Sequence, residues 1–338
     1  GKTTLLEAIA ICAFSKSFQP VSDLSLIKYG ETSYFSELSA INDLDINYKV
    51  KINYQSGSKK EINSTFGNNL LAKDIIGILP LVVLSPDLKI ITSGSPQDRR
   101  DFIDRLLSQS SRTYLEKLMD YRKILKQRNN FLNRIKHERI FDRNLLESWT
   151  EMLISKGIDL IIYRNNFIRD FIPFFESTYN IVSKAKETVK LEYLPNNISS
   201  EMLTSNLIKK DLYDVYKLVS TKLENEEIRR GLTLFGPQKD ELSIKIDSGI
   251  AKESASQGQH KTLLVSLKFA EFNFLKEKRN ETPVVLLDDI FSELDSERVK
   301  KVFELLISNS AQTFITITDI GMLKDVASNS EFSFYKVN

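Results

Sequence analysis

The middle of the chain carries apolar residues at the spacing of α-helices. One helical face runs from Leu118 to Ile135 and is interrupted at Arg128, and a second helix is expected from residue 144 to about 183. Residues three or four apart share one face of a helix, so both stretches can pack antiparallel, although they are too short for a long coiled coil. The helix-spaced residues are Leu118, Tyr121, Leu125, Leu132 and Ile135, then Leu145, Trp149, Met152 and Leu160, with Trp149 expected in the core.

A different pattern precedes two acidic residues nearer the other end. After Pro283 come four apolar residues without alternation, and then Asp288 and Asp289. Such a run is typical of a strand covered on both faces, as in a parallel sheet. An amphipathic helix is predicted before this strand, with Leu263, Leu267, Ala270 and Phe274 on its buried face. A parallel-sheet strand together with helices predicts an α/β fold.

Composition and charge narrow these possibilities. A chain of 338 residues can form one large domain with an insertion, or two domains. The net charge of +2 neither favours nor excludes nucleic acid, so a DNA-binding surface has to come from local clusters of charge. Cys12 is the single cysteine, which excludes an internal disulfide, and two histidines leave no plausible zinc cluster. No apolar run approaches the ~18 residues of a membrane span, so we expect a soluble, cytoplasmic protein without a membrane partner.

The chain opens on Gly1-Lys2-Thr3-Thr4, which matches the end of a phosphate-binding loop, G-x-x-x-x-G-K-[ST]. In that motif backbone N–H groups cradle phosphates, the lysine neutralises the β- and γ-phosphates, and the Ser/Thr hydroxyl binds Mg²⁺. These four residues are therefore candidates for ATP binding, and Thr3 for binding the metal. The tripeptide G-K-T is common, so the assignment needs a second element. A helix that packs on a sheet is expected to follow, with Leu5, Ala8, Ile9 and Cys12 at helical spacing.

Asp288 and Asp289 supply the second element. Carboxylates at the carboxyl end of a parallel strand lie where α/β folds place their ligands. This predicts a Walker B element in which Asp288 holds Mg²⁺ and Asp289 orients or deprotonates the attacking water. The alternative is a buried strand followed by an acid that caps a helix. The next segment, F-S-E-L-D at 291–295, makes this alternative weaker.

A third element opens the helix before this strand, at Ser256-Gln257-Gly258-Gln259. A small, polar, glycine-bearing turn at a helix start offers free N–H groups and the positive end of the helix dipole to an anion. A well-capped helix without any ligand fits the same residues. Ahead of a Walker B strand, however, the turn resembles the signature sequence of ABC-type ATPases, which contacts the γ-phosphate bound to the opposite subunit. Ser256, Gly258 and Gln259 are candidates for that contact.

Further blocks lie between these elements and directly after the last of them. They are Leu84-Ser85-Pro86-Asp87-Leu88, Gly94-Ser95-Pro96, Arg99-Arg100-Asp101-Phe102-Ile103-Asp104, Phe235-Gly236-Pro237-Gln238-Lys239-Asp240 and Ser292-Glu293-Leu294-Asp295. In this order, from residue 1 to about 318, the chain resembles the RecF family of bacterial recombinational-repair and replication proteins. The family carries a P-x-D-L block, a G-x-P-x-x-R-R-x-F-x-D block and a G-P-H-R-D-D block at the corresponding places.

The resemblance implies an ABC-type P-loop ATPase head with a mostly helical inserted domain. The head would occupy residues 1–98 and 230–338, and the insertion residues 99–229. ATP and Mg²⁺ are the implied cofactors, with an ATP-driven homodimer on gapped or junction DNA and weak, DNA-stimulated ATP hydrolysis. RecR and RecO are the implied partners, in loading RecA onto single-stranded DNA. The resemblance also implies that the first strands and the glycine-rich arch of the loop precede Gly1.

This chain departs from the family pattern in two places. Gln238 and Lys239 replace a His-Arg pair, so a phosphate or base contact assigned there is in doubt. The segment 312–319 lacks the switch histidine of transporter ATPases, which leaves the γ-phosphate sensor open.

The insertion holds the strongest basic cluster. Such a cluster fits phosphate contacts with DNA or a solvated helix face. Its members between residues 112 and 143 are Arg112, Lys117, Arg122, Lys123, Lys126, Arg128, Arg134, Lys136, Arg139 and Arg143. Arg99 and Arg100 are also candidates for DNA, or for local pairs with Asp98, Asp101 or Asp104.

Three other functions remain open on the sequence alone. A P-loop kinase with a small substrate predicts turnover by a monomer and no effect of DNA. A scaffold that binds nucleotide without hydrolysing it predicts an ATP-dependent dimer that survives Asp289→Asn unchanged. Another ABC-type chromosome or repair ATPase would share the ATP site and differ in its DNA substrate.

Overall fold

The computed structural model describes residues 1–138, 141–183, 187–203 and 209–318, together with residues 333, 335 and 336. The chain divides into two compact units. Unit 1 comprises Gly1–Ile90, Phe174–Lys186 and Ser256–Asn338, and unit 2 comprises Ile91–Pro173 and Glu187–Ala255. The division into domains at residues 98 and 229 stays a prediction.

The described residues of unit 1 form two sheets and the helices that cover them. Its elements are α1 (Lys2–Phe14), η1 (Asp23–Leu26), β1 (Ser33–Ile41), β2 (Asn47–Gln55), β3 (Glu61–Ser64), α2 (Ala72–Ile75), β4 (Leu81–Leu84), η2 (Pro86–Lys89), α9 (Gln257–Arg279), β8 (Val284–Asp288), η5 (Ile290–Glu293), α10 (Ser296–Ser308) and β9 (Thr313–Thr316). One sheet has the order β1-β2-β3 and is antiparallel, and the other has the order β4-β8-β9 and is parallel.

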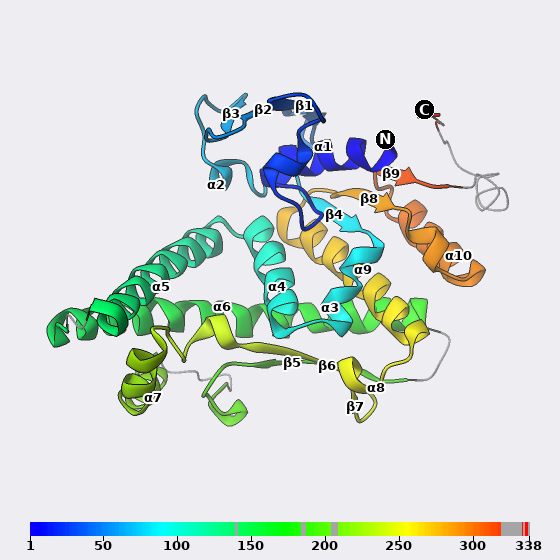
Figure 1. Cartoon of the computed structure of the whole chain (residues 1–338). Coiled ribbons are helices and arrows are strands. Elements are labelled where there is room, and N and C mark those ends of the chain that lie inside the picture. Colours follow the sequence, from blue (N-terminus) through cyan, green and yellow to red (C-terminus); the bar gives the residue numbers. More distant parts are fainter. Residues whose placement is uncertain (139–140, 184–186, 204–208, 319–332, 334, 337–338) are drawn as a thin grey trace. The chain divides into compact units, whose positions relative to one another are not determined.

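Helix α1 lies between the two sheets of unit 1 (Figure 1). Its small residues Ala10 and Ala13 are fully buried, which lets the helix approach both sheets closely. Val50 of β2 and Leu286 of β8 belong to the same core cluster. The predicted helix after Thr3 is therefore confirmed, but its buried face was partly wrong, because Leu5 is 59% exposed.

The parallel sheet explains the apolar run before Asp288. Leu81 and Val83 of β4 belong to the core cluster that contains α1. Alternate side chains of a strand point to opposite faces, so the buried Val82 and Leu84 face the other way. Helix α9 packs against β4 and against α10. A sheet covered on both faces needs apolar residues at every position, which confirms the predicted strand.

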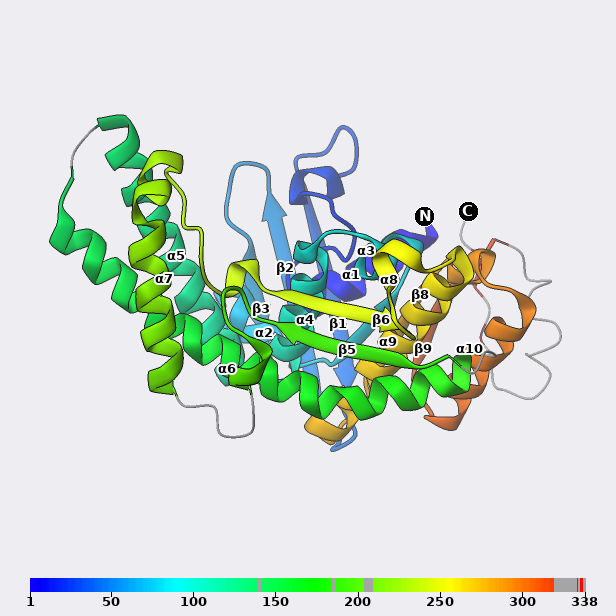
Figure 2. The ribbon, with the colours of Figure 1, turned by 90° about the horizontal axis from the view of Figure 1, so that it is seen from below.

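Unit 2 combines long helices with a small sheet. Its elements are α4 (Pro96–Ser110), α5 (Arg112–Glu138), β5 (Val189–Leu194), η3 (Ser200–Leu203), α7 (Lys209–Arg230), η4 (Pro237–Lys239), β6 (Glu241–Ile246), β7 (Gly249–Ile250) and α8 (Ala251–Ser254). Helices α3 (Ile90–Ser93) and α6 (Arg143–Val182) contribute residues to both units. The predicted helices are confirmed, whereas the antiparallel sheet β5-β6-β7, drawn beside α6 in Figure 2, was not predicted.

A three-helix cluster accounts for the predicted face of α5. Leu132 and Ile135 pack with Leu146 of α6, and Trp149 lies partly buried against them. Arg128 occupies this face because Glu227 of α7 pairs with it at 2.6 Å, and both side chains are buried. The exposed Leu145 and Met152 show that the apolar face of α6 was assigned one position off in its first turns. No helix among the described residues is long and apolar enough to cross a membrane.

Candidate nucleotide site

The first turn of α1 presents the predicted phosphate-binding residues. Gly1 precedes the helix as its N-cap residue. Lys2 is exposed, and its Nζ donates to the carbonyl oxygen of Ile317 over 2.5 Å. Ile317 directly follows β9, so the lysine lies at the carboxyl end of the parallel sheet. This is the edge where parallel α/β sheets bind ligands.

Asp288 ends β8 at the same edge and is 6% exposed. Its Oδ1 accepts hydrogen bonds from Thr3 Oγ1 at 3.0 Å and from Thr316 Oγ1 at 2.7 Å. Among the described residues, no cation pairs with this carboxylate. A buried carboxylate without a counter-charge is costly, so the arrangement favours a cation at this position.

The donor set around Asp288 fits Mg²⁺. Thr3 Oγ1 and Asp288 Oδ1 are hard oxygen ligands that lie 3.0 Å apart. Adjacent oxygens around an octahedral Mg²⁺ lie about 2.9 Å apart, because the metal–oxygen bonds are about 2.0–2.1 Å. The described residues contain no group of three or more His, Cys, Asp or Glu side chains that could hold a metal. A site of one carboxylate and one hydroxyl suits Mg²⁺, which keeps waters and takes further oxygens from bound phosphates.

Asp289 follows in an uncommon backbone conformation, with φ 48° and ψ 25° in the left-handed region. Its backbone N–H is shared between the carbonyl oxygen of Thr316 at 3.2 Å and Thr316 Oγ1 at 3.0 Å. Sequence reasoning missed Thr316. The signal was the strand 312–319 itself, because a strand parallel to β8 places Thr316 opposite Asp288. Asp319, the last residue of the segment that lacks the switch histidine, lies outside the described residues.

Ser256, Gly258 and Gln259 form the first turn of α9. Ser256 is exposed and caps the helix: its Oγ accepts from the backbone N–H of Gln259 at 3.2 Å, while Gln259 Oε1 accepts from the N–H of Ser256 at 2.7 Å. This reciprocal capping box fixes the turn. The predicted capped turn at the helix start is confirmed, and its contact with a nucleotide stays a prediction.

The segment after Asp289 connects to the signature turn through Arg298. Asp295 caps α10 by accepting from the backbone N–H of Arg298 at 2.9 Å. The Nε of Arg298 donates to Thr262 Oγ1 at 2.9 Å, and that hydroxyl donates to the carbonyl of Gly258 at 3.1 Å. A guanidinium therefore lies directly behind the first turn of α9.

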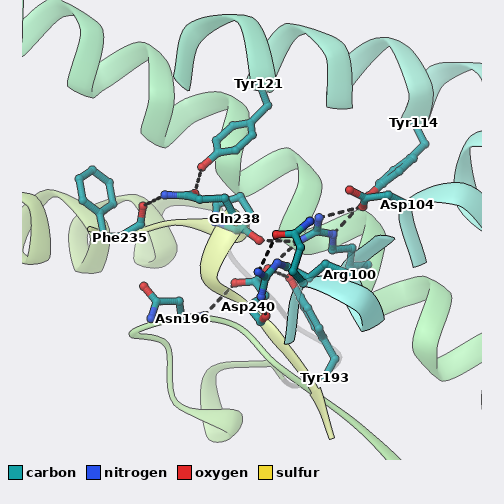
Figure 3. A network of polar contacts seen from close by, with 12 residues as sticks. Arg100, Asp104, Tyr114, Tyr121, Tyr193, Asn196, Phe235, Gln238 and Asp240 are labelled. Atoms are coloured by element: carbon teal, nitrogen blue, oxygen red, sulfur yellow. Dashed lines mark hydrogen bonds and ion pairs between the residues drawn. The ribbon is translucent and has the colours of Figure 1, made fainter. Parts of the chain in front are cut away.

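The two remaining blocks meet inside unit 2, in the network of Figure 3. Arg164 bridges Asp240 at 2.9 Å and Asp104 at 2.8 Å, and all three side chains are buried. Hydroxyl groups of Tyr114 and Tyr193 donate to Asp104 and Asp240 respectively. Burial raises the pKa of both tyrosines far above the usual range, so they remain donors. The network is closed, since both carboxylates have a cation and a hydroxyl partner.

Arg99 and Arg100 take part in the interior of unit 2, which corrects the predicted local pairs, whereas their contact with DNA stays a prediction. Arg99 forms a two-bond ion pair with Glu241, at 2.7 and 2.8 Å. Arg100 donates to the backbone carbonyl of Asp240 at 2.6 Å and to Gln97 Oε1 at 2.8 Å. The expected local pairs with Asp98, Asp101 or Asp104 are replaced by contacts across unit 2.

The block around Gly236 is also internal. Gln238 accepts from the Tyr121 hydroxyl and donates to the carbonyl of Phe235 at 2.7 Å. Gly236 has φ 109°, and a Cβ there would lie 2.7 Å from the Tyr121 oxygen. The exposed Lys239 is the residue of this turn that faces solvent.

Half of the ten residues of the predicted basic cluster already form ion pairs. Ion pairs join Arg112 to Glu116, Lys117 to Asp159, Arg122 to Asp104, Arg128 to Glu227 and Arg134 to Glu138. Lys123, Lys126 and Arg143 are exposed, and no described residue pairs with either lysine. Arg139 lies outside the described residues. The charge available to a ligand is therefore smaller than the sequence count indicates.

Comparison with known proteins agrees with this architecture. Solved structures of the recombination mediator protein RecF in the RecFOR pathway, as RecF-ATP and RecF-ATPrS, align with TM-scores of 0.86 and 0.85. The RecF-ATP structure is 28% identical in sequence, with 98% of this chain and 84% of that chain covered. For RecF-ATPrS the identity is 26%, and the coverage is 95% and 85%.

The fold and the site define the class of protein to which the chain belongs. It is an ABC-type P-loop ATPase head with a mostly helical inserted domain. The family model "RecF/RecN/SMC N terminal domain" matches residues 1–337. The protein "DNA replication and repair protein RecF" of Chloroherpeton thalassium is 38% identical, over 94% of this chain and 86% of its own length. That of Shouchella clausii is 36% identical, over 96% and 86%. The chain belongs to the RecF family.

Proposed function

We propose that this chain is an ATP-dependent DNA-binding protein of recombinational repair and replication, with an ATP site completed by a second copy of the chain. The observation that carries the proposal is the contact of Thr3 with Asp288. It joins the hydroxyl after the phosphate-loop lysine to the carboxylate of the Walker B strand, at a spacing suited to Mg²⁺. The kinship with RecF proteins, two of them solved as RecF-ATP and RecF-ATPrS, supports ATP as the ligand.

Each residue has a task in this proposal. Lys2 would leave the Ile317 carbonyl and donate to the β- and γ-phosphates, while Thr3 and Asp288 hold the metal. Bound Mg²⁺ would neutralise the phosphate charge. Asp289 would take a proton from the water that attacks the γ-phosphorus, as the bond to the β–γ bridging oxygen breaks.

The signature turn supplies the reason for two copies. Ser256 is exposed, and its Oγ already accepts from its own helix, which leaves its hydroxyl hydrogen for an outside acceptor. The first N–H groups of α9 favour an anion at the same point, while the Arg298 guanidinium behind them is paired with Asp295 and braces the turn. We propose that this turn binds the γ-phosphate held by the other copy, so that ATP joins two heads.

DNA and the protein partners rest on kinship. We propose that the closed dimer binds gapped or junction DNA in the cytoplasm, and that ATP hydrolysis, slow and stimulated by DNA, reopens it. Because the two solved relatives act in the RecFOR pathway, we propose RecO and RecR as partners in loading RecA. A P-loop kinase would instead turn over as a monomer.

The test is ATP-dependent dimerisation, measured by sedimentation, together with ATP turnover with and without DNA. Ser256→Arg places a large cation and side chain in the turn, so we expect dimerisation and turnover to fall at least about tenfold. Ser56→Arg, in an exposed turn between β2 and β3, is the matched control and should behave like the wild type. Asp289→Asn should still dimerise with ATP and should reopen more slowly.

Other results would overturn the proposal. Normal dimerisation and hydrolysis by Ser256→Arg would exclude the composite site. Turnover by a monomer without an effect of DNA would favour a kinase. An ATP-dependent dimer that Asp289→Asn leaves unchanged, with no hydrolysis by the wild type, would favour a scaffold.

A further inference from the structure

The hydroxyl of Thr316 lies between the two consecutive acidic residues of the candidate site. It donates to Asp288 Oδ1 over 2.7 Å and accepts from the backbone N–H of Asp289 over 3.0 Å. Building on the proposed function, we infer that Thr316 is a positioning residue for ATP hydrolysis. Its hydroxyl holds the Asp289 backbone in the conformation that aims this carboxylate at the attacking water.

The backbone of Asp289 explains why such a contact matters. Its φ of 48° lies in the left-handed region, which L-residues other than glycine adopt at a cost. A residue in this conformation keeps it when neighbouring bonds fix it. The carbonyl and the hydroxyl of Thr316 share the Asp289 N–H, so removing the hydroxyl weakens the hold on the strained residue. The Asp289 carboxylate would then lose its fixed direction.

Asp288 depends less on the same hydroxyl. It also accepts from Thr3, and this bond survives when the Thr316 hydroxyl is removed. Metal and nucleotide binding should therefore persist while hydrolysis falls. This asymmetry distinguishes a positioning role in catalysis from a general loss of structure.

Threonine suits the position on three counts. The parallel register sets Thr316 opposite Asp288, so the two side chains lie side by side. The residue is 8% exposed, so water competes weakly for its hydroxyl. Its β-branch restricts χ1, which keeps the oxygen directed at Asp288 and Asp289. Valine preserves this shape without the hydroxyl, and serine preserves the hydroxyl with less stiffness.

The test compares Thr316→Val with Thr316→Ser in the whole protein, using steady-state ATP turnover and binding of a fluorescent ATP analogue with Mg²⁺. We expect Thr316→Val to lower kcat about tenfold while the Kd for the nucleotide stays within about twofold. Thr316→Ser should keep kcat within about threefold of the wild type. Thr313→Val is the matched control, since Thr313 lies in the same strand opposite Val285 and donates to the Ala311 carbonyl. Its kcat should equal that of the wild type.

Equal kcat values for Thr316→Val and Thr316→Ser would overturn the inference, and so would a loss of nucleotide binding that matches the loss of kcat. If Thr316→Val does not fold, Thr316→Cys replaces it, because a thiol is a weak donor and acceptor. Its kcat should then fall below that of Thr316→Ser, and equality would contradict the inference. A wild-type protein that neither binds nor hydrolyses ATP would instead refute the proposed function itself.

Discussion

Each unit contains a cluster of acidic residues in which buried carboxylates accept hydrogen bonds from hydroxyl groups. The two clusters differ in whether a cation neutralises these carboxylates. In unit 2, Arg164 neutralises Asp104 and Asp240, and tyrosine hydroxyls complete their hydrogen bonds. In unit 1, Asp288 receives two threonine hydroxyls and, within the described residues, no cation. Both clusters come from blocks that resemble family motifs. A closed cluster stabilises the fold, whereas an incomplete one leaves a place for a ligand.

The difference separates structural from functional motif residues better than sequence does. Arg99, Arg100 and Gln238 all have internal partners, so they hold unit 2 together. Lys2 is exposed and bonded to a backbone carbonyl, a contact that it can exchange for a phosphate. The criterion is whether the charge already has a partner that a ligand would have to displace.

The largest expected effect comes from opening the closed cluster. Arg164→Met leaves the buried Asp240 without a cation and leaves Asp104 with Arg122 alone, so we expect unfolding free energy to fall by about 3–5 kcal/mol. The measurement is urea unfolding followed by fluorescence of Trp149, the one tryptophan, which packs against α5 in the same unit. The exposed Arg169 of the same helix provides the control, and Arg169→Met should change stability by less than about 0.5 kcal/mol. Equal stabilities for the two variants would mean that the network contributes nothing.

Removing the charge of Asp288 should leave stability nearly unchanged and lower ATP turnover strongly, in contrast with Arg164→Met. Asp288→Asn removes a buried charge but keeps an oxygen for both hydroxyls, so stability should change by less than about 1 kcal/mol. Turnover of ATP should fall roughly 100-fold, because the metal loses its carboxylate ligand. Unfolding by urea and ATP turnover across a Mg²⁺ titration measure the two effects. A variant that loses several kcal/mol of stability, or hydrolyses ATP normally, would remove the contrast between the clusters.

The sequence predicted the site residues that belong to a local sequence pattern. It missed the site residue whose role depends on which strands pair in the sheet. Lys2, Thr3, Asp288 and Ser256 could be found because local patterns define a phosphate loop, a buried strand and a capped helix. Thr316 could not, because its importance arises from a parallel register between segments 28 residues apart. The long helices were predicted from their period. The sheet β5-β6-β7 was missed because β5 and β6 pair across a long stretch of intervening chain.

The same limit explains the errors about charge. Counting Lys and Arg residues predicts a basic surface, but three of the five described ion-paired basic residues of α5 have their partners on other helices. Lys117 pairs with Asp159 of α6 at 2.6 Å, and Arg122 pairs with Asp104 of α4 at 3.0 Å. Sequence distance hides these pairs. Helix α5 therefore carries both ion-paired and unpaired basic residues, the same distinction that separates the two acidic clusters.

The smallest expected effect tests this distinction on α5 itself. Lys123 and Lys126 are exposed and unpaired by any described residue, so they remain available to phosphates if α5 contacts DNA. Replacing both by alanine should lower DNA affinity roughly tenfold at physiological salt and reduce the slope of log affinity against log salt by about 2. The measurement is fluorescence anisotropy with gapped DNA, in the presence of ATP, over a range of salt. The matched control replaces Arg112 and Arg134, whose charges Glu116 and Glu138 already neutralise. Because these two arginines already pair with glutamates, their replacement should remove no contact with a DNA phosphate. The control should therefore change the slope by less than about 1. A larger slope change in the control than in the lysine variant would show that existing ion pairs do not decide which charges meet DNA.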